Sequence, residues 1–286
     1  MQIILNADDF GASSSINAAI RQAHQEGVLT STSLMVAGEA ASEAVSLARS
    51  MPDLAVGLHL VVVAGRAILP PGEIPHLVNQ RGEFSQDAVG AGIHYFFSTS
   101  ARQELAKELR AQFDRFTLTG LPLSHVDGHE HMHLHPTVFS LLLPLLDQYH
   151  VCGLRLPRDD LWLSLRYDRR RAALKTCWAL VFGILNRWCW RRLQGRAIAI
   201  PHRVYGFMQS GQMQEAYVLR LLKELDVPTA ELYFHPDTAD KPAHLGPNPD
   251  DLATLTSPRV RQMIRERNLQ TVTYPALNLK GGKQND

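Results

Sequence analysis

Cysteine is scarce in this chain of 286 residues, and no apolar run is long enough to span a bilayer. The three cysteines are an odd number and have no C-x-x-C spacing, which argues against a disulfide framework and against a cysteine-based zinc site. No charged and apolar leader precedes the strand-like residues 2–6, so the sequence predicts a cytoplasmic protein. The net charge of +1 gives no sign of a nucleic-acid partner.

Short apolar segments alternate with helical periodicities, a pattern typical of βα units. Strands are predicted at residues 2–6, 31–36, 54–58, 122–127, 152–156, 231–235 and 271–274. Helices are predicted at about 13–27, 39–50, 101–116, 136–146, 212–225 and 258–268. About seven parallel strands joined by helices fit a distorted or incomplete TIM-like (β/α) barrel, with a doubly wound open sheet as the alternative.

Two segments interrupt this rhythm within a predicted single domain of residues 1–280. Residues 64–98 are rich in proline and glycine, and we interpret them as a loop or lid over an active site. Residues 155–203 hold twelve basic residues against three acids, in a chain that is otherwise nearly neutral. Here we expect a basic and apolar helical insertion near 160–203. Residues 281–286 are predicted to form a flexible tail.

The insertion contains an apolar run, residues 177–185, flanked by arginines and followed by two tryptophans. The run is far shorter than the roughly 20 residues that cross a bilayer. Arginine and tryptophan beside an apolar face suit an interfacial helix on anionic lipid. A buried barrel helix with a solvated basic face is the alternative, and the sequence alone favours it.

Acidic and histidine side chains stand at the predicted ends of four strands, where catalytic groups gather in barrels of parallel strands. They are Asp8 and Asp9 after the first strand, His59 after the third, His129 just beyond the fourth and His235 after the sixth. Adjacent carboxylates repel each other unless a cation compensates, so a metal held by one would leave the other as a base. The alternatives are a helix N-cap for the aspartates and hydrogen-bonded core residues for His59 and His235.

Residues 125–135 read His-Val-Asp-Gly-His-Glu-His-Met-His-Leu-His. In an extended chain His125, Asp127 and His129 share one face. Imidazoles bind divalent metals, and a carboxylate such as Asp127 can orient a ligand ring. The residues predicted to contact the substrate or to support the metal ligands are His125, Asp127, His131, His133 and Arg155. A solvated histidine-rich loop is the alternative for this stretch. Histidine side chains in general titrate near neutrality, so a histidine such as His235 could protonate a leaving amine.

Three motifs resemble those of the YdjC-like carbohydrate deacetylases, a family that includes chitooligosaccharide deacetylases. They are Asn6-Ala7-Asp8-Asp9-Phe10-Gly11, Gly57-Leu58-His59 and Ser124-His125-Val126-Asp127-Gly128-His129. The likeness runs from residue 2 to about 157 and resumes around 231–237. The proline-rich residues 68–75 and the arginine-rich insertion are similar to the hopanoid-biosynthesis-associated branch of this family.

The resemblance implies a TIM-like barrel with one divalent metal held by Asp9, His59 and His129, and with Asp8 as the base. His235 matches the late histidine of the family, which acts as acid or oxyanion partner. The resemblance suggests Mg²⁺, while a mixed His/Asp site also accepts Zn²⁺, Mn²⁺ or Co²⁺. Several members have His where this chain has Glu130, which leaves the details of the substrate open.

The predicted reaction is the removal of the N-acetyl group from an acetylated amino sugar by metal-activated water. A sugar carried by a lipid such as a hopanoid would suit a peripheral contact of residues 160–203 with the inner face of the membrane. Hydrolysis of a phosphoester or another amide is one alternative, although no glycine-rich phosphate loop is present. A non-catalytic sugar- or lipid-binding protein with a structural metal is another, and the spare carboxylate of Asp8 argues against it. The sequence leaves the oligomeric state open.

Overall fold

A buried N-terminal strand, β1 (Gln2–Phe10), lies at the centre of a parallel sheet. The computed structural model describes residues 1–239 and 246–277, so the predicted tail at 281–286 lies outside the described residues. The strands follow the order β4-β3-β2-β1-β6-β5, with β7 beside the start of β1. Their bounds are β2 Ser31–Leu34, β3 Ala55–Leu60, β4 Leu123–Gly128, β5 Arg203–Tyr205, β6 Thr229–Phe234 and β7 Gln270–Thr271.

The sheet curves into a half-barrel, and isolated backbone contacts continue it between β4 and β5. The amide of Val126 on β4 donates to the carbonyl of Gly153 (2.9 Å), and the amide of Leu154 donates to the carbonyl of Ala199 (3.0 Å). The predicted strand at 152–156 therefore pairs through single bridges and does not form a continuous ladder. The prediction of a TIM-like parallel fold is confirmed, and the short strand β5 is an addition to it.

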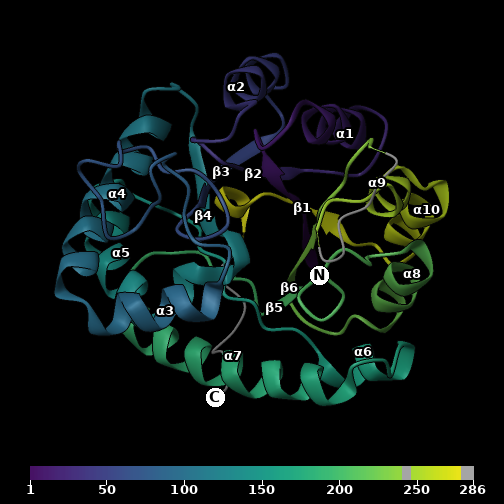
Figure 1. Cartoon of the computed structure of the whole chain (residues 1–286). Coiled ribbons are helices and arrows are strands. Elements are labelled where there is room, and N and C mark those ends of the chain that lie inside the picture. The colour runs from purple at the N-terminus through teal and green to yellow at the C-terminus, as the bar shows by residue number, and fades with distance from the viewer. Residues whose placement is uncertain (240–245, 278–286) are drawn as a thin grey trace.

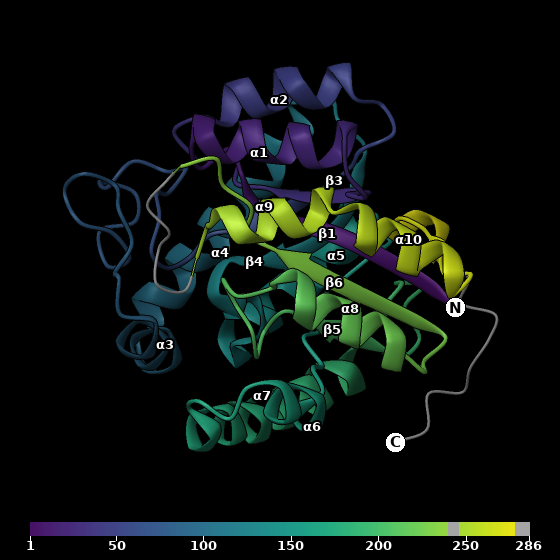
Figure 2. The same ribbon diagram turned by 90° about the vertical axis from the view of Figure 1, so that its right-hand side faces the viewer.

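Helices surround the sheet on its outer side (Figure 1). Six of them match predicted helices: α1 Ser14–Gln25, α2 Ala41–Ser50, α4 Thr99–Thr117, α5 Pro136–Gln148, α8 Glu215–Glu224 and α10 Pro258–Glu266. Four were not bounded from the sequence: α3 Ala88–Phe97, α6 Leu161–Tyr167, α7 Ala172–Leu193 and α9 Pro249–Thr256. Two 3₁₀ turns, His129–Leu134 and Tyr274–Ala276, complete the elements. Figure 2 shows the barrel from the side, with β1 running away from the N-terminus towards α3.

Helix α1 shows how local sequence sets an element. Its N-cap, Ser13, accepts a hydrogen bond from the amide of Ile16 (3.3 Å), which satisfies one of the free amides of the first turn. The residues that face the sheet are apolar at helical spacing and include Ile16, Ala19, Ile20 and Ala23, as predicted. Burial of this face fixes the helix against β1.

The segment 64–98 is tied to helix α4 by buried carboxylates. Glu108 accepts hydrogen bonds from the amides of Ile68 (2.9 Å) and Leu69 (3.0 Å), and Glu104 accepts one from the amide of His76 (2.9 Å). The last part of the segment forms α3. An extended chain without its own sheet needs such partners for its amides, and α4 supplies them.

Helix α7 lies on the outside of the barrel. Its inner stripe buries Phe182, Asn186, Cys189 and Leu193. Its outer face carries exposed apolar side chains, among them Leu180, while Phe182 of the same apolar run is buried. Only this inner stripe of α7 packs against the barrel, and the apolar side chains on its other side therefore point outward. Within the described residues no helix is long and apolar enough to cross a membrane.

Candidate metal centre

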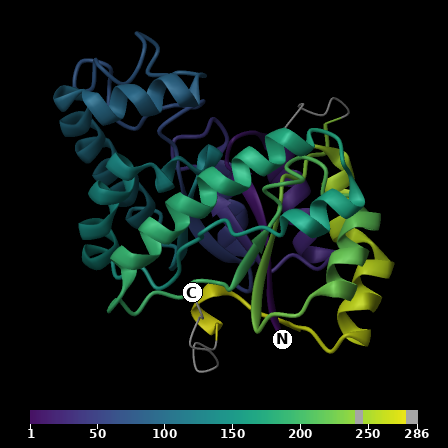
Figure 3. The same cartoon turned by 90° about the horizontal axis from the view of Figure 1, so that it is seen from below.

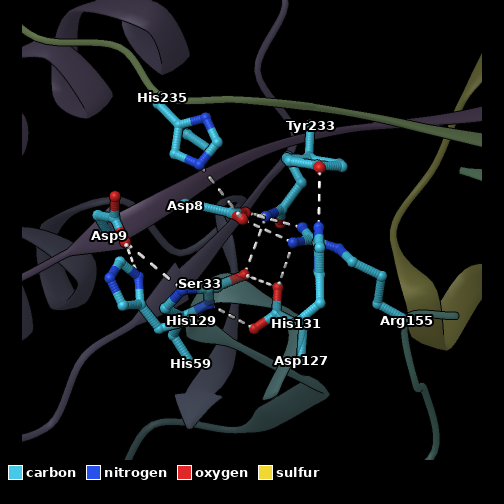
Figure 4. A network of polar contacts seen from close by, with 12 residues as sticks. Asp8, Asp9, Ser33, His59, Asp127, His129, His131, Arg155, Tyr233 and His235 are labelled. Carbon is cyan, nitrogen blue, oxygen red and sulfur yellow. Dashed lines mark hydrogen bonds and ion pairs between the residues drawn. The ribbon is translucent and has the colours of Figure 1, made fainter. Parts of the chain in front are cut away.

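The carboxyl ends of β1, β3, β4 and β6 bring together the acidic and histidine side chains that the sequence singled out (Figure 4). Asp8 and Asp9 lie on β1, His59 on β3 and Asp127 on β4, while His129 and His235 directly follow β4 and β6. Parallel strands point their carboxyl ends to one edge, so residues far apart in sequence meet there. These six side chains therefore share one edge of the sheet.

Asp9, His59 and His129 form a cluster with the spacing of metal ligands. Asp9 Oδ1 lies 3.4 Å from His59 Nε2 and 3.2 Å from His129 Nδ1. One ligand atom from each of the three lies within 4.8 Å of the others. Asp9 Oδ1 is buried and makes no hydrogen bond within the described residues, a costly state for a carboxylate oxygen unless a cation compensates. These residues therefore fit one divalent ion.

The backbone and a neighbouring carboxylate aim these ligands. Asp9 has φ of 65°, a left-handed conformation that is uncommon outside glycine and that marks a bulge at the end of β1. His59 Nδ1 lies 2.7 Å from Asp127 Oδ1, so its Nε2 points towards Asp9. Ser33 on β2 in turn donates to Asp127 Oδ2 (2.7 Å). Such a carboxylate behind a histidine is the usual support of a metal ligand.

The charges of the cluster hold Asp9 ionised. Burial alone would raise the pKa of Asp9, but His129, His235 and His59 outweigh burial and lower it well below the usual range. Burial would lower the pKa of His59, and Asp127 chiefly reverses this and raises it to about 9. Without a metal ion, a proton on the His59 ring therefore balances part of the negative charge of the aspartates. A bound cation would balance the same charge.

Arg155 lies behind the cluster and joins three buried carboxylates. It donates two hydrogen bonds to Asp8 (2.6 and 2.8 Å), and its Nη1 lies 2.9 Å from Asp127 Oδ2. Its Nε and Nη2 donate to Glu231 on β6 (3.0 and 2.8 Å). The guanidinium also lies 4.4 Å from the ring centre of Tyr233. Burial would lower the pKa of Arg155, but Asp127, Asp8 and Glu231 raise it well above its usual value.

His235 lies on the other side of Asp8. Its Nε2 is 4.0 Å from Asp8 Oδ2, and its backbone amide donates to Asp251 Oδ2 (2.8 Å) at the start of α9. The side chain is mostly buried, and its Nδ1 has no hydrogen-bond partner among the described residues. One ring nitrogen therefore faces the carboxylate that the sequence predicts as the base.

The remaining histidines of residues 125–135 take different places. His131 Nε2 lies 2.9 Å from the hydroxyl of Tyr233, at the edge of the cluster. His133 is buried, and its Nε2 lies 2.9 Å from the carbonyl of Arg155. His125 stacks on Tyr274 with ring centres 4.4 Å apart, and its Nε2 is 3.1 Å from Ser33 Oγ. His125 and His133 thus lie behind the candidate metal ligands.

The sequence analysis assigned no role in the site to several residues that the structure places there. They are Asn6, which donates to Asp8 and Ser33, together with Ser33, Glu231, Tyr233 and Asp251. Glu231 could have been recognised from the sequence, because an acidic residue inside an apolar strand needs a buried partner of opposite charge or a hydrogen-bond donor. Serine and tyrosine carry no comparable signal, since both are ordinary strand residues.

The fold and the cluster define an α/β barrel with a candidate metal centre at the carboxyl ends of its strands. The chain belongs to the YdjC-like protein family, whose model matches residues 2–266. A carbohydrate deacetylase of Vibrio parahaemolyticus is 38% identical over 97% of this chain and 96% of its own length. A chitooligosaccharide deacetylase of Serratia marcescens is 33% identical over 93% and 94%.

One solved structure shares the fold along nearly the whole chain. It is a protein of Enterococcus faecalis V583 with a proposed role in cellobiose-phosphate cleavage. The TM-score is 0.71 at 24% identity, and the match covers 97% of this chain and 99% of that chain. At this identity the likeness concerns the fold alone.

Proposed function

We propose that this protein is a metal-dependent carbohydrate deacetylase that hydrolyses the N-acetyl group of an acetylated amino sugar. The observation that carries the proposal is the Asp9–His59–His129 cluster with the separate carboxylate of Asp8 beside it. A structural metal site would be closed by its ligands, whereas Asp9, His59 and His129 alone would leave a position for water or substrate, as catalytic sites do. The relatives named as carbohydrate deacetylases support the choice of the amide bond.

Asp9, His59 and His129 would hold the ion, which we take to be Mg²⁺, as the family resemblance suggests. A divalent ion in such a site lowers the pKa of bound water and polarises a carbonyl oxygen. The protein side chains supply the proton transfers. Asp8 accepts the proton of the attacking water, and the two hydrogen bonds from Arg155 fix the orientation of the Asp8 carboxylate. His235, on the far side of Asp8, protonates the departing amine.

The first test is acetate release from N-acetylglucosamine oligosaccharides before chelation, after chelation and after addition of Mg²⁺, Zn²⁺, Mn²⁺ or Co²⁺. We expect chelation to abolish release and one of these ions to restore it. Asp8→Asn should lower kcat by about 10²-fold or more, because proton transfer is lost. The variant should still bind one ion, measured by calorimetry, since Asp8 is not among the proposed ligands.

Two results would contradict this division of roles. Equal loss of metal and activity in Asp8→Asn would make Asp8 a ligand. No acetate release by a metal-loaded, folded protein would direct the search to another bond, such as a phosphoester, or to a binding role.

The proposal extends to a lipid-linked form of the sugar, such as a glycosylated hopanoid, with residues 160–203 in peripheral contact with the inner face of the membrane. Support comes from the arginine-rich insertion and its exposed apolar side chains. Comparison of kcat/KM for free and lipid-linked N-acetylglucosamine tests this extension, and a preference for the free oligosaccharide would contradict it.

A further inference from the structure

The outer face of α7 carries exposed apolar side chains between residues 174 and 184. Trp178 is 40% exposed, Leu180 66% and Ile184 72%. Leu174 and Val181 are also exposed in this stretch of the helix. We call these five residues the α7 outer patch. Exposed apolar side chains gathered in this way mark a site of contact with another apolar body.

The exposed charges of α7 and of the three residues before it are all positive, while Asp168, just before these, pairs with Arg170 and Lys175. Helix α7 contains no acidic residue. Exposed arginines stand on both sides of the patch along the chain: Arg169, Arg170 and Arg171 before it, and Arg187, Arg191 and Arg192 after it. Between Lys175 and Arg187 no residue is charged. A protein partner would need a matching acidic rim around an apolar centre, whereas an anionic lipid bilayer offers that combination by its nature.

The α7 outer patch connects with the metal centre through packed aromatic rings. Trp178 lies 5.9 Å from Phe207, measured between ring centres, and Phe207 lies 5.4 Å from His131. His131 reaches Tyr233, whose ring lies under the guanidinium of Arg155. Seen from below, α7 runs obliquely across the molecule (Figure 3), and it contacts the turn His129–Leu134 that follows β4. A molecule or surface bound at the α7 outer patch would therefore lie next to the candidate metal centre.

We propose that the α7 outer patch and its flanking arginines form a docking surface for an anionic lipid bilayer. The apolar side chains enter the acyl boundary, Trp178 lies at the headgroup level and the arginines contact lipid phosphates. The helix lies in the plane of the interface and does not cross it. The docking itself is independent of catalysis. Its purpose, to present a sugar on a lipid headgroup to the metal centre, rests on the proposed function.

Co-sedimentation of the full-length protein with vesicles tests the proposal. Vesicles of phosphatidylcholine with phosphatidylglycerol should bind the protein at low salt, and vesicles of phosphatidylcholine alone should bind it at least tenfold more weakly. Ile184→Glu should weaken binding to the anionic vesicles about tenfold or more, because it places a carboxylate in the apolar patch. The matched control is Leu118→Glu, which changes a side chain 79% exposed at the end of α4 and should bind as the unchanged protein does.

Absence of binding to anionic vesicles at low salt would overturn the proposal, and so would equal weakening by Ile184→Glu and Leu118→Glu. A dimer that light scattering detects and Ile184→Glu dissociates, without vesicle binding, would assign the patch to a second copy of the chain. Acetate release from a soluble oligosaccharide separates this proposal from the deacetylase proposal. We expect Ile184→Glu to keep that release, and vesicle binding without any acetate release would leave the docking surface standing and the proposed function refuted.

Discussion

A single guanidinium organises the buried charges of this site. Arg155 contacts Asp8, Asp127 and Glu231, and the side chains of all four are at most 3% exposed. Carboxylates crowded into an apolar interior would normally take up protons, since burial and mutual repulsion raise their pKa values. Burial does raise the pKa of Glu231, whereas Arg155 and His59 keep the pKa of Asp127 well below its usual value. The proposed base and the support of His59 thus depend on one side chain.

Replacement of Arg155 should therefore be costly for stability. Arg155→Met removes the positive charge and leaves three buried carboxylates without their partner, which should lower the free energy of unfolding by about 3–5 kcal/mol. Urea unfolding followed by circular dichroism measures this. The matched control, Arg158→Met, changes an exposed arginine three residues further along and should cost less than about 1 kcal/mol. A loss below 1 kcal/mol for Arg155→Met would show that the carboxylates do not need the guanidinium.

At the level of strands and helices, the position of the acidic and histidine side chains at the strand ends was the most predictable feature. The ends of parallel strands form one edge, so Asp9 at the end of β1, His59 on β3 and His129 after β4 were expected to meet, and they do. Most helix positions also followed from apolar spacing. This success has a simple cause, because strand-end position and periodicity are both local properties of the sequence.

Contacts across the barrel were beyond such reasoning. Arg155 was named from its place in the sequence, but its bonds to Asp8 and Glu231 span 147 and 76 residues of chain. The sequence left open whether the apolar run of α7 is buried, since helical periodicity shows that a helix has two faces but does not show how much of an apolar face its neighbours can cover. The short strand β5 was missed because three residues carry no periodicity.

The attachment of segment 64–98 to α4 leads to a prediction for an element. Glu108→Ala removes the acceptor of the amides of Ile68 and Leu69, and each unsatisfied amide costs about 1–3 kcal/mol. Local opening should therefore become easier, and hydrogen exchange at these two amides should be at least tenfold faster. Glu73→Ala, at an exposed position in the same segment, should leave exchange unchanged. Equal exchange in both variants would show that other contacts hold the segment.

For the whole molecule, the buried histidines make stability depend on pH. His125 and His133 are both fully enclosed, and burial lowers the pKa of each to about 4. In the unfolded chain a histidine takes up a proton near pH 6.5. Between pH 6.5 and pH 4 these two histidines are protonated in the unfolded chain and neutral in the folded protein. Acidification through this range therefore favours unfolding.

His133→Gln isolates one such contribution. Glutamine can donate to the carbonyl of Arg155 as the His133 ring does, but it does not titrate. The unchanged protein should lose about 3 kcal/mol of stability between pH 6.5 and pH 4 through His133, because a difference of one pKa unit corresponds to about 1.36 kcal/mol. The gap in unfolding free energy between protein and variant should shrink by that amount over this range, measured by urea unfolding with chelator present throughout. His94→Gln, at an exposed histidine, serves as the control and should follow the unchanged protein at every pH. A constant gap would mean that His133 takes up its proton in the folded protein as readily as in the unfolded chain, and that the interior around Arg155 admits charge.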